Sequence, residues 1–317
     1  MISVAMTTFN GEKYIEKQIE SILNQSLSVD EIIICDDGST DNTIELMKKY
    51  NVQIIQNKKN LGYKLNFKKA MEKCKGDYIF LCDQDDIWKK DKVKEMISIM
   101  EKNRNIHVLA SSFEYIDEND TLIISKNNKG YSNNNLYNKE VKQDDVVQVK
   151  TDEFIYGNYF QGCALAIDKK TKDFFVHHFD ERIPHDWIIS LYGSLDGGMY
   201  FLNKPLFEYR IHSQNSIGVS TLNQDASTHV KRAYQFEERY QKARDALYVL
   251  DILKINCRDY YLRNKVNYLK IESFMNNHIE YLRNKKLFKL FFQNKYAYYR
   301  KLKTIRGRIM DLVYCLK

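Results

Sequence analysis

The six cysteines of this 317-residue chain form no C-x-x-C pair. They are scattered from Cys35 to Cys315, which is typical of free, mostly buried thiols in a reducing compartment and unlike a disulfide framework. No apolar stretch approaches the roughly 18 residues that a membrane-spanning helix needs. The first residues, MISVAMTTFN, lack the basic segment and long apolar core of a secretion signal. We therefore expect a cytoplasmic protein.

Charge is distributed unevenly along the chain. Hydrophobic residues make up 44% and charged residues 29% of the sequence, which is ordinary for a soluble globular protein. The net charge is +7, but residues 220–317 contain 21 lysine and arginine residues against 9 acidic ones, and residues 1–219 contain 28 against 33. A mildly acidic body followed by a basic tail predicts two modules with different partners. We place these modules at 1–220 and 221–317.

Apolar segments of two kinds alternate over the first 116 residues. Short apolar runs predict strands, and segments with apolar residues at helical spacing predict helices between them. This alternation predicts the α/β class, with a mostly parallel sheet and helices on both of its faces. The expected strands are 2–9, 31–35, 52–56, 77–82 and 107–116, and the expected helices are 14–23, 42–50, 62–74 and 90–103.

Polar side chains follow three of these strands at the point where each strand ends. They lie in the segments Thr7–Asn10, Asp36–Ser39 and Asp83–Asp86. Open parallel sheets bind their ligands beyond the carboxyl ends of the strands. We therefore expect the three segments to converge on one crevice.

Regular patterns become sparse after residue 118. The segment 118–150 is rich in Asn and Lys, which favours a solvated loop, although a flexible cover over the crevice would have the same composition. A Gly-bounded stretch, GNYFQGCALAID, a helix that begins at HDWIISL and a strand pair around MYFLN and PLFEYRIH are expected next. From residue 225 onward the pattern is helical and dense in Tyr, Phe, Lys and Arg.

The stretch LCDQDDIW places Asp83, Asp85 and Asp86 at the end of a buried strand. Mg²⁺ and Mn²⁺ bind one or two carboxylates together with substrate phosphates, and a D-x-D supplies such an open site. An EF-hand is excluded by Ile87 and Trp88, and a classic dinucleotide site is excluded because no G-x-G-x-x-G follows the first strand. Two alternatives remain, an aspartyl-phosphate phosphatase with Asp83 as nucleophile and capping by Asp86 of a helix near Ile87.

Three longer segments add context to these carboxylates: SVAMTTFNGEKYIEKQIESILNQS, IIICDDGSTDNT and NLGYKLNFKKAMEKCKGDYIFLCDQDDIW. In order and spacing, the chain over residues 1–217 resembles the family 2 glycosyltransferases, which have the nucleotide-sugar-binding fold called GT-A. DQDDIW together with NLGYKLNF is most similar to the branch that contains many bacterial rhamnosyltransferases. The resemblance implies a GT-A catalytic domain with a C-terminal helical extension and transfer of one sugar from a nucleoside-diphosphate donor.

The resemblance also implies which residues hold the nucleotide base. In similar enzymes the end of the first strand and an Asp after the second strand do so. Here these residues would be Thr7, Thr8 and Phe9, with Asp37 accepting from the ring N–H of a uracil or thymine. Asp36 is the second candidate for the same bond.

The diphosphate and the metal are expected beside the aspartates. By resemblance, Asp83 lies near the ribose, and Asp85, together with Asp83 and His212, binds Mn²⁺ or Mg²⁺. Arg210, in the segment YRIHSQNSIG, is a candidate phosphate clamp. The remaining donor-side residues are Asn10, Asn60, Gly62, Asn66 and Gln84; an ordinary turn is the structural alternative for the segment 60–62.

A general base is expected in RIPHDWIISL, because similar enzymes carry a catalytic Asp there, often within an E-D pair. In this chain the pair is His185–Asp186. A carboxylate on the face of the sugar opposite the leaving group accepts the proton of the incoming hydroxyl, and such a one-step displacement inverts the anomeric centre. Capping of the helix is the structural alternative for Asp186. The acceptor side is expected to include Asp86, Gly157, Gly162, His185 and Trp187.

Substrates are expected by the same resemblance. The first donor to consider is dTDP-rhamnose, followed by UDP-hexoses, and the acceptor would be a bacterial cell-surface glycan or a lipid-linked glycan. Neither tryptophan belongs to a Q-x-x-R-W motif, which disfavours a processive polymerase. A non-catalytic nucleotide-sugar-binding protein remains an alternative.

The basic, aromatic C-terminal region has two main interpretations. Its helices could attach peripherally to the inner face of the plasma membrane, where lipid-linked acceptors are found. Alternatively, they could form a subdomain that packs on the catalytic domain or on a second subunit as a homo-oligomer. No nucleic-acid-binding motif accompanies the charge, so no nucleic-acid partner is expected.

Overall fold

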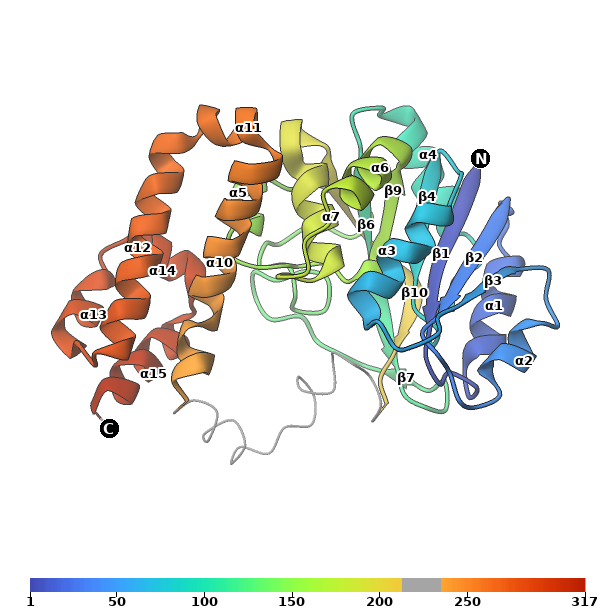
Figure 1. Ribbon diagram of the computed structural model, residues 1–317, viewed down its shortest axis with the longest axis horizontal. Coiled ribbons are helices and arrows are strands. Elements are labelled where there is room, and N and C mark those ends of the chain that lie inside the picture. The colour runs from blue at the N-terminus through green and yellow to red at the C-terminus, as the bar shows by residue number, and fades with distance from the viewer. Residues whose placement is uncertain (213–234, 317) are drawn as a thin grey trace. The chain divides into compact units, whose positions relative to one another are not determined.

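The computed structural model describes residues 1–212 and 235–316 (Figure 1). The chain divides into two compact units. The first consists of Met1–Thr151 and Asn158–Gln214, and the second consists of Asp152–Gly157 and Asn215–Lys317. The boundary that the sequence predicts after residue 220 lies outside the described residues.

One mixed sheet organises the first unit. The strand order is β3-β2-β1-β4-β9-β6-β10-β5, with β7 paired to β6 and β8 paired to β10. Strands β3, β2, β1 and β4 run parallel, as do β6 and β10, while β9 is antiparallel to both of its neighbours. The predicted α/β class with a mostly parallel sheet is confirmed. The strands are β1 Ile2–Thr8, β2 Glu31–Asp36, β3 Gln53–Gln56, β4 Tyr78–Cys82, β5 Ile87–Trp88, β6 Val108–Ile116, β7 Leu122–Ile123, β8 Val146–Gln148, β9 Leu165–Asp168 and β10 Met199–Arg210.

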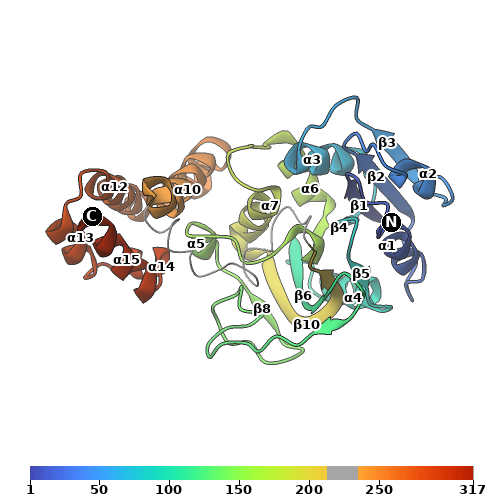
Figure 2. The same cartoon turned by 90° about the horizontal axis from the view of Figure 1, so that it is seen from below.

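Helices cover both faces of this sheet because its central strands are buried on both sides. All seven residues of β1 are buried. Val4 and Met6 pack in one core cluster with apolar side chains of α1, α2 and α4, whereas α3, α6 and α7 lie on the opposite face (Figure 2). The helices are α1 Ile15–Leu23, α2 Thr43–Met47, α3 Tyr63–Lys73, α4 Lys92–Lys102, α6 Lys169–His177 and α7 His185–Ser194, with short 3₁₀ turns at Gly162–Ala164 and Leu195–Gly197. The short helix α5 Thr151–Phe154 belongs mostly to the second unit.

Strand β10 replaces the strand pair that the sequence predicts around MYFLN and PLFEYRIH. It runs unbroken from Met199 to Arg210 and shifts its register against β6 on either side of Pro205. Proline has no N–H to donate to the ladder, so the strand becomes irregular at that point instead of ending. The prediction of two strands is therefore wrong.

The residues after the aspartates also differ from expectation. Ile87 and Trp88 form β5, which pairs with β10, and α4 begins only at Lys92 with Asp91 at its N-cap position. The chain is still extended where a helix was expected to begin. Capping of such a helix by Asp86 is therefore wrong.

The Asn- and Lys-rich segment 118–150 is anchored to the first unit. Tyr137 is 1% exposed, and its ring lies 5.5 Å from that of Phe160 and 5.6 Å from that of Phe201. The side-chain amide of Asn134 donates to the carbonyl oxygen of Phe113 at 2.6 Å. Most of the segment is exposed, as the expected solvated loop requires, but a buried aromatic side chain anchors it to the protein.

The described part of the second unit consists mainly of helices, and the predicted helical C-terminal extension is confirmed. The long helices α10 and α12 pack along each other. Within the described residues, no helix combines the length and the apolar character that crossing a membrane requires. The helices are α10 Phe236–Asn256, α11 Arg258–Arg263, α12 Lys265–Arg283, α13 Leu287–Gln293, α14 Ala297–Leu302 and α15 Ile305–Leu316.

Candidate functional site

The tip of β1 is held to the loop after β4 by one glutamine. The Gln84 side chain accepts from the backbone N–H of Phe9 at 2.8 Å and donates to its carbonyl at 3.1 Å. A Cβ on Gly11 would lie 2.3 Å from Gln84 Oε1, so only glycine leaves room for this bond. The Phe9 ring remains 46% exposed beside these contacts. Gln84 thus fixes the strand tip, and Gly11, which the sequence reasoning missed, is required for it.

Asp36 and Asp37 are both buried after β2, and each one organises a turn. Asp36 accepts from the backbone N–H groups of Gly38 and Ser39 at 3.0 and 2.8 Å, and from the hydroxyl of Thr8 at 2.9 Å. Asn10, with φ of 50°, joins the same turn, since its backbone N–H donates to the Ser39 hydroxyl at 2.8 Å. These contacts bring the tips of β1 and β2 together, as the parallel order predicts.

Asp37 connects β2 to the segment before α3. It accepts from the backbone N–H groups of Leu61 and Gly62, both at 2.8 Å, and from the Asn57 side chain at 2.9 Å. A carboxylate has about four acceptor positions, so one remains for a further donor. Gly62 adopts a φ of 81°, which glycine reaches without strain.

Two further asparagines complete this network. Asn66 is 1% exposed, donates to the carbonyl of Cys35 at 2.8 Å and accepts from Asn57 at 2.9 Å. Asn60 accepts from the Gly62 N–H at 3.0 Å. Thr7 is buried at the end of β1. The structure therefore brings the segment 57–66 to the tips of β1 and β2, where the resemblance places it.

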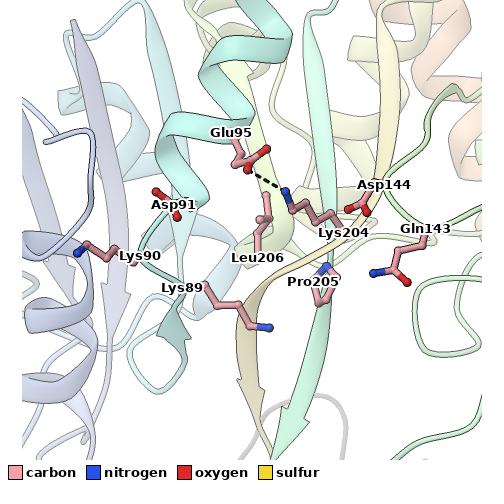
Figure 3. Close-up of a pocket in the computed structure, with 9 residues that line it drawn as sticks. All are labelled: Lys89, Lys90, Asp91, Glu95, Gln143, Asp144, Lys204, Pro205 and Leu206. Carbon is pink, nitrogen blue, oxygen red and sulfur yellow. Dashed lines mark hydrogen bonds and ion pairs between the residues drawn. The ribbon is translucent and has the colours of Figure 1, made fainter.

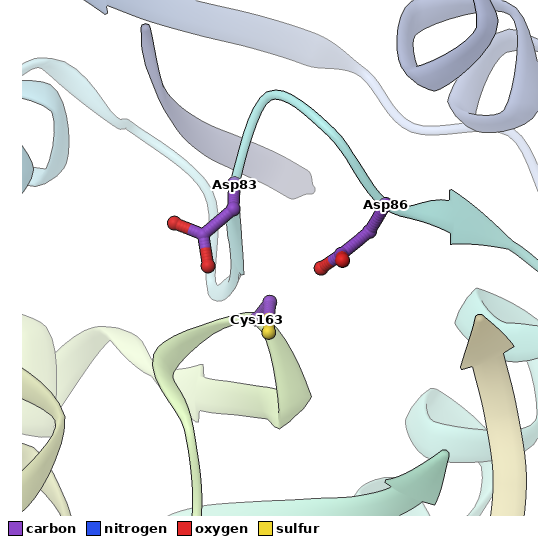
Figure 4. A group of neighbouring side chains, drawn as sticks. All are labelled: Asp83, Asp86 and Cys163. Atoms are coloured by element: carbon purple, nitrogen blue, oxygen red, sulfur yellow. The ribbon is translucent and has the colours of Figure 1, made fainter. Parts of the chain in front are cut away.

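Two carboxylates and a thiol face one another beyond β4 (Figure 4). Ligand atoms of Asp83, Asp86 and Cys163 all lie within 4.8 Å of one another. Desolvation, followed by repulsion from Asp85, raises the pKa of Asp83 to about 7, and the same causes hold the pKa of Asp86 well above its usual range. Among the described residues, the buried Oδ2 of Asp86 has no hydrogen-bond partner.

A cation fits this arrangement. Carboxylate oxygens are the ligands that Mg²⁺ and Mn²⁺ prefer, and a positive charge would relieve both the desolvation and the mutual repulsion. Burial raises the pKa of Cys163 well above its usual range, so this protonated thiol is a poor ligand for either ion. Asp85 lies apart from the cluster, where its Oδ2 is 2.8 Å from Nε2 of His212.

Arg210 supports the aspartate loop from within. Its side chain is fully buried; Nε donates to the carbonyl of Asp85 at 2.7 Å, and its backbone N–H donates to Asp86 at 3.1 Å. A guanidinium nitrogen pairs with Asp120 at 2.5 Å, and the guanidinium lies 4.6 Å from the centre of the Tyr14 ring. This placement suits a residue that positions the loop more than a residue that reaches out to a phosphate.

A buried lysine that the sequence reasoning missed lies beneath the cluster. Lys92 is fully buried at the start of α4, and its ammonium donates to the carbonyl of Cys163 at 2.7 Å. The ammonium lies 4.5 Å from the centre of the Trp88 ring and 4.1 Å from that of Phe207. Burial lowers the pKa of Lys92 to about 8, while Cys163 and the nearby carboxylates oppose this shift. No sequence signal distinguishes it from the many surface lysines.

Asp186 lies in the first turn of α7 and is half-buried. The N-cap position belongs to Pro184 and α7 has no side-chain cap, so the capping alternative for Asp186 is wrong. Desolvation raises its pKa to about 6, against hydrogen bonds from the backbone of Trp187 and the side chain of Asn158. The charge of Asp186 contributes to the raised pKa of Asp83, after desolvation and repulsion from Asp85.

His185 packs beside Asp186 with both ring nitrogens buried. Among the described residues, neither nitrogen has a hydrogen-bond partner. The ring stacks on Phe67 at 4.1 Å, and a Cβ on Gly162 would lie 2.7 Å from Nε2. Burial lowers the pKa of His185 to about 3, so the imidazole is neutral. Trp187 is 7% exposed, which favours packing.

A separate hollow lies at the start of α4, between the segment 89–95 and β10 (Figure 3). It has a volume of about 380 Å³, and its lining includes none of the predicted site residues. Lys204 crosses it to pair with Glu95 at 2.8 Å. Its charges are therefore partly neutralised within the protein, and the cluster at Asp83 remains the stronger candidate.

Comparison with known proteins agrees with this geometry. Residues 3–158 match the family described as Glycosyl transferase family 2. The chain carries a family 2 glycosyltransferase domain. A dTDP-rhamnosyl transferase of Shigella flexneri, RfbG, is 26% identical over 301 residues, which cover 86% of this chain and 88% of that protein. An uncharacterized glycosyltransferase of Haemophilus influenzae is 30% identical over 153 residues, and the match spans only 46% of that protein and 47% of this chain.

Solved structures agree on the fold. TarS from S. aureus, crystallised in complex with UDP-GlcNAc, has a TM-score of 0.55 and 16% sequence identity, covering 99% of this chain and 91% of that chain. At this identity the likeness shows the fold alone. The fold of the first unit is GT-A, as the resemblance predicts.

Proposed function

We propose that this glycosyltransferase is inverting and metal-dependent, and that it transfers one sugar to a hydroxyl of a bacterial cell-surface glycan or a lipid-linked acceptor. The observation that supports this most is the carboxylate cluster at Asp83 and Asp86 together with a separate carboxylate, Asp186, whose charge acts on Asp83. The name of RfbG supports dTDP-rhamnose as the first donor to test. The UDP-GlcNAc complex of TarS supports UDP-hexoses as the second.

The donor would lie across the tips of β1, β2 and β4. Phe9 would stack on the base, and the remaining acceptor position of Asp37 would receive a ring N–H. Asp83 and Asp85, with Asp86 and His212 nearby, would hold Mn²⁺ or Mg²⁺. When bound, the metal supplies Lewis-acid stabilisation of the negative charge on the leaving diphosphate. Arg210 and Lys92 would position this loop, because both are buried and contact its backbone or that of Cys163.

Asp186 would act as general base. The acceptor oxygen bonds to the anomeric carbon while the bond from that carbon to the diphosphate oxygen breaks, and the hydroxyl proton passes to the Asp186 carboxylate. A pKa of about 6 keeps most of Asp186 ionised at neutral pH. It also lies closer to the operating pH than the pKa of an ordinary aspartate, which makes Asp186 a better general base. His185, whose neutral ring has no hydrogen-bond partner among the described residues, would bond to hydroxyls of the acceptor.

Thermal unfolding of the purified protein with UDP, dTDP, GDP and CMP, each with and without Mn²⁺, tests the donor site. A nucleotide at 100 times its Kd stabilises the folded state by about 2.7 kcal/mol, so the midpoint should rise with UDP or dTDP only when Mn²⁺ is present. Asp85→Ala should abolish that rise, whereas Glu45→Gln, an exposed helical carboxylate, should preserve it. No rise with any nucleotide would contradict the proposal, and trapping of fluoroberyllate at Asp83 would favour a phosphatase.

A further inference from the structure

A hollow in the second unit has no part in the proposed transfer reaction. It has a volume of about 710 Å³ and lies between one face of α12 and the segment that runs through α13 into α14. These three helices lie together in the C-terminal unit (Figures 1 and 2). On α12 the lining positions 269, 270, 273, 274, 277 and 281 recur every three or four residues, so they share a face.

The walls of this hollow are braced from behind by a buried polar network. Gln293, which lines it, accepts at 2.8 Å through its Oε1 from Nδ1 of His278. Tyr299 and Lys303 both donate to the buried carboxylate of Asp311 at 2.7 Å. These contacts join α12, α13, α14 and α15, so the hollow is built into the fold and does not depend on surface side chains alone.

Three lysines surround the hollow, and none has an ion-pair partner among the described residues. They are Lys270, Lys289 and Lys295, and all three are exposed or half-buried lining residues. The neighbouring Lys286, in contrast, pairs with Glu280 at 2.5 Å. An uncompensated cluster of cations around a concavity favours an anionic ligand.

The remaining lining is apolar and partly exposed to water. Phe292 is 63% exposed, Leu269 is 47% exposed and Tyr296 is 45% exposed. Just outside the hollow on α13, Phe288 and Phe291 are 76% and 57% exposed. Phe288, Phe291 and Phe292 recur at three- and four-residue spacing along α13, so they share a face. A group of exposed large apolar side chains marks an interaction site, whereas isolated ones would be ordinary.

We propose that this hollow and its rim bind an anionic phospholipid at a membrane surface, with the phosphate between the three lysines and the upper acyl chain against Phe292 and Leu269. Hydrocarbon and phosphate on one ligand match the two kinds of lining. A second copy of this chain matches less well, because residues 220–317 carry 21 basic against 9 acidic residues and would repel their own kind. Nucleic acid offers no hydrocarbon to cover Leu269 and Phe292.

Co-sedimentation of the full chain with lipid vesicles tests this site without any sugar donor, so its outcome is separate from that of the proposed function. The vesicles are phosphatidylcholine with and without phosphatidylglycerol. The variant with Lys270, Lys289 and Lys295 all changed to Gln is compared with a control that changes Lys254, Lys285 and Lys301 to Gln. Both variants lose the same charge from the same unit. The mutated side chains are at the surface, and unchanged thermal midpoints would verify folding.

We expect wild-type protein to bind only the vesicles that contain phosphatidylglycerol. The hollow variant should lose about 100-fold in affinity, and the control should lose less than about tenfold. Phe292→Ser should also weaken binding, although it changes no charge. Equal losses in the two lysine variants would mean diffuse attraction without a site and would overturn the proposal.

Three further results would also overturn it. The first is full displacement of the protein from vesicles by glycerol phosphate, when chloride at the same ionic strength leaves it bound. A free phosphate would then suffice as the ligand. Self-association of the wild type in sedimentation velocity runs without vesicles, lost in the hollow variant, would show that the hollow joins two copies of the chain. Wild-type binding to pure phosphatidylcholine at equal affinity would remove the role of the lysines.

Discussion

Two fully buried aspartates, one in each unit, have opposite surroundings. Asp311 in the second unit accepts from Lys303 and Tyr299 at 2.7 Å, and Arg239 approaches it at 3.5 Å. Asp86 in the first unit accepts a backbone N–H at 3.1 Å and interacts with the Cys163 thiol, and it has no ion pair among the described residues. Asp311 is paired with cations, whereas Asp86 lies beside a second carboxylate, that of Asp83.

This difference separates a structural carboxylate from one that is arranged for a ligand. Charge removed from water costs free energy unless it is paired, so the pairs around Asp311 stabilise the folded helices. Lys92, a buried cation near Asp86, donates to the carbonyl of Cys163 and not to a carboxylate. Desolvation and repulsion from Asp85 raise the pKa values of Asp83 and Asp86, and a bound cation would relieve both. The incomplete cluster is where a metal would add most.

The largest expected effect concerns Asp186, a carboxylate outside this pair that is also desolvated. Asp186→Asn should lower the transfer rate about 10²–10⁴-fold, because an amide cannot accept the hydroxyl proton. Donor binding should change by less than a factor of two, since the proposed role of Asp186 is toward the acceptor hydroxyl. Single-turnover rates and donor titrations measure the two quantities. Transfer at more than a few per cent of the wild-type rate would remove Asp186 as the base.

Asp311→Asn should strongly destabilise the second unit. It would leave the buried Lys303 ammonium without a counter-charge, which costs about 3–5 kcal/mol. Urea unfolding followed by circular dichroism measures this loss. Glu280→Gln is the matched control, because the pair of Glu280 with Lys286 is exposed to water and contributes little to stability. Equal effects of the two variants would mean that Asp311 is not the centre of a stabilising network.

The pH dependence of transfer should follow Asp186. The base acts only when ionised, so kcat/KM should be constant above its pKa of about 6 and fall about tenfold per pH unit below it. An ordinary aspartate would keep its activity to lower pH. The measurement is initial rate against pH with saturating metal. A profile that stays flat down to pH values near an ordinary aspartate pKa of about 4 would contradict the desolvated setting of Asp186.

The smallest effect is expected for Asp86→Asn, and its direction differs from that of Asp311→Asn. Removing one of two neighbouring carboxylates relieves repulsion, so metal-free stability should stay within about 1 kcal/mol of wild type or increase. The Mn²⁺-dependent rise with nucleotide should shrink. Urea unfolding without metal measures the stability, and thermal unfolding with Mn²⁺ and nucleotide measures the rise of the midpoint. A loss as large as that of Asp311→Asn would erase the distinction between the two aspartates.

Much of the fold could be predicted because its signals are local. Apolar runs in the first strands and helical spacing between them depend on residues two to four positions apart. The parallel order then placed the segments at Thr7, Asp36 and Asp83 on one edge of the sheet. The prediction failed at Pro205 and Ile87, where pairing of β10 with distant strands decided the local conformation.

The candidate site was predictable in its residue types and less so in its contacts. The sequence indicated Asp83, Asp85 and Asp186 through motif and position. It did not indicate that Gln84 would hold the backbone of Phe9 and require Gly11, or that Lys92 would be buried. Nothing in the pattern around Lys92 or Arg210 distinguishes a buried cation from the many exposed ones.

The sequence by itself thus determined the α/β class, the strand tips that carry polar groups and the basic, helical character of the C-terminal region. These properties follow from periodicity and composition, which neighbouring residues express. Only the tertiary structure decided which buried polar groups meet. The backbone N–H of Arg210 reaches the Asp86 carboxylate across 124 residues of sequence, and the Lys92 ammonium reaches the carbonyl of Cys163 across 71. Such partners are selected by the packing of the whole sheet, and no local pattern encodes them.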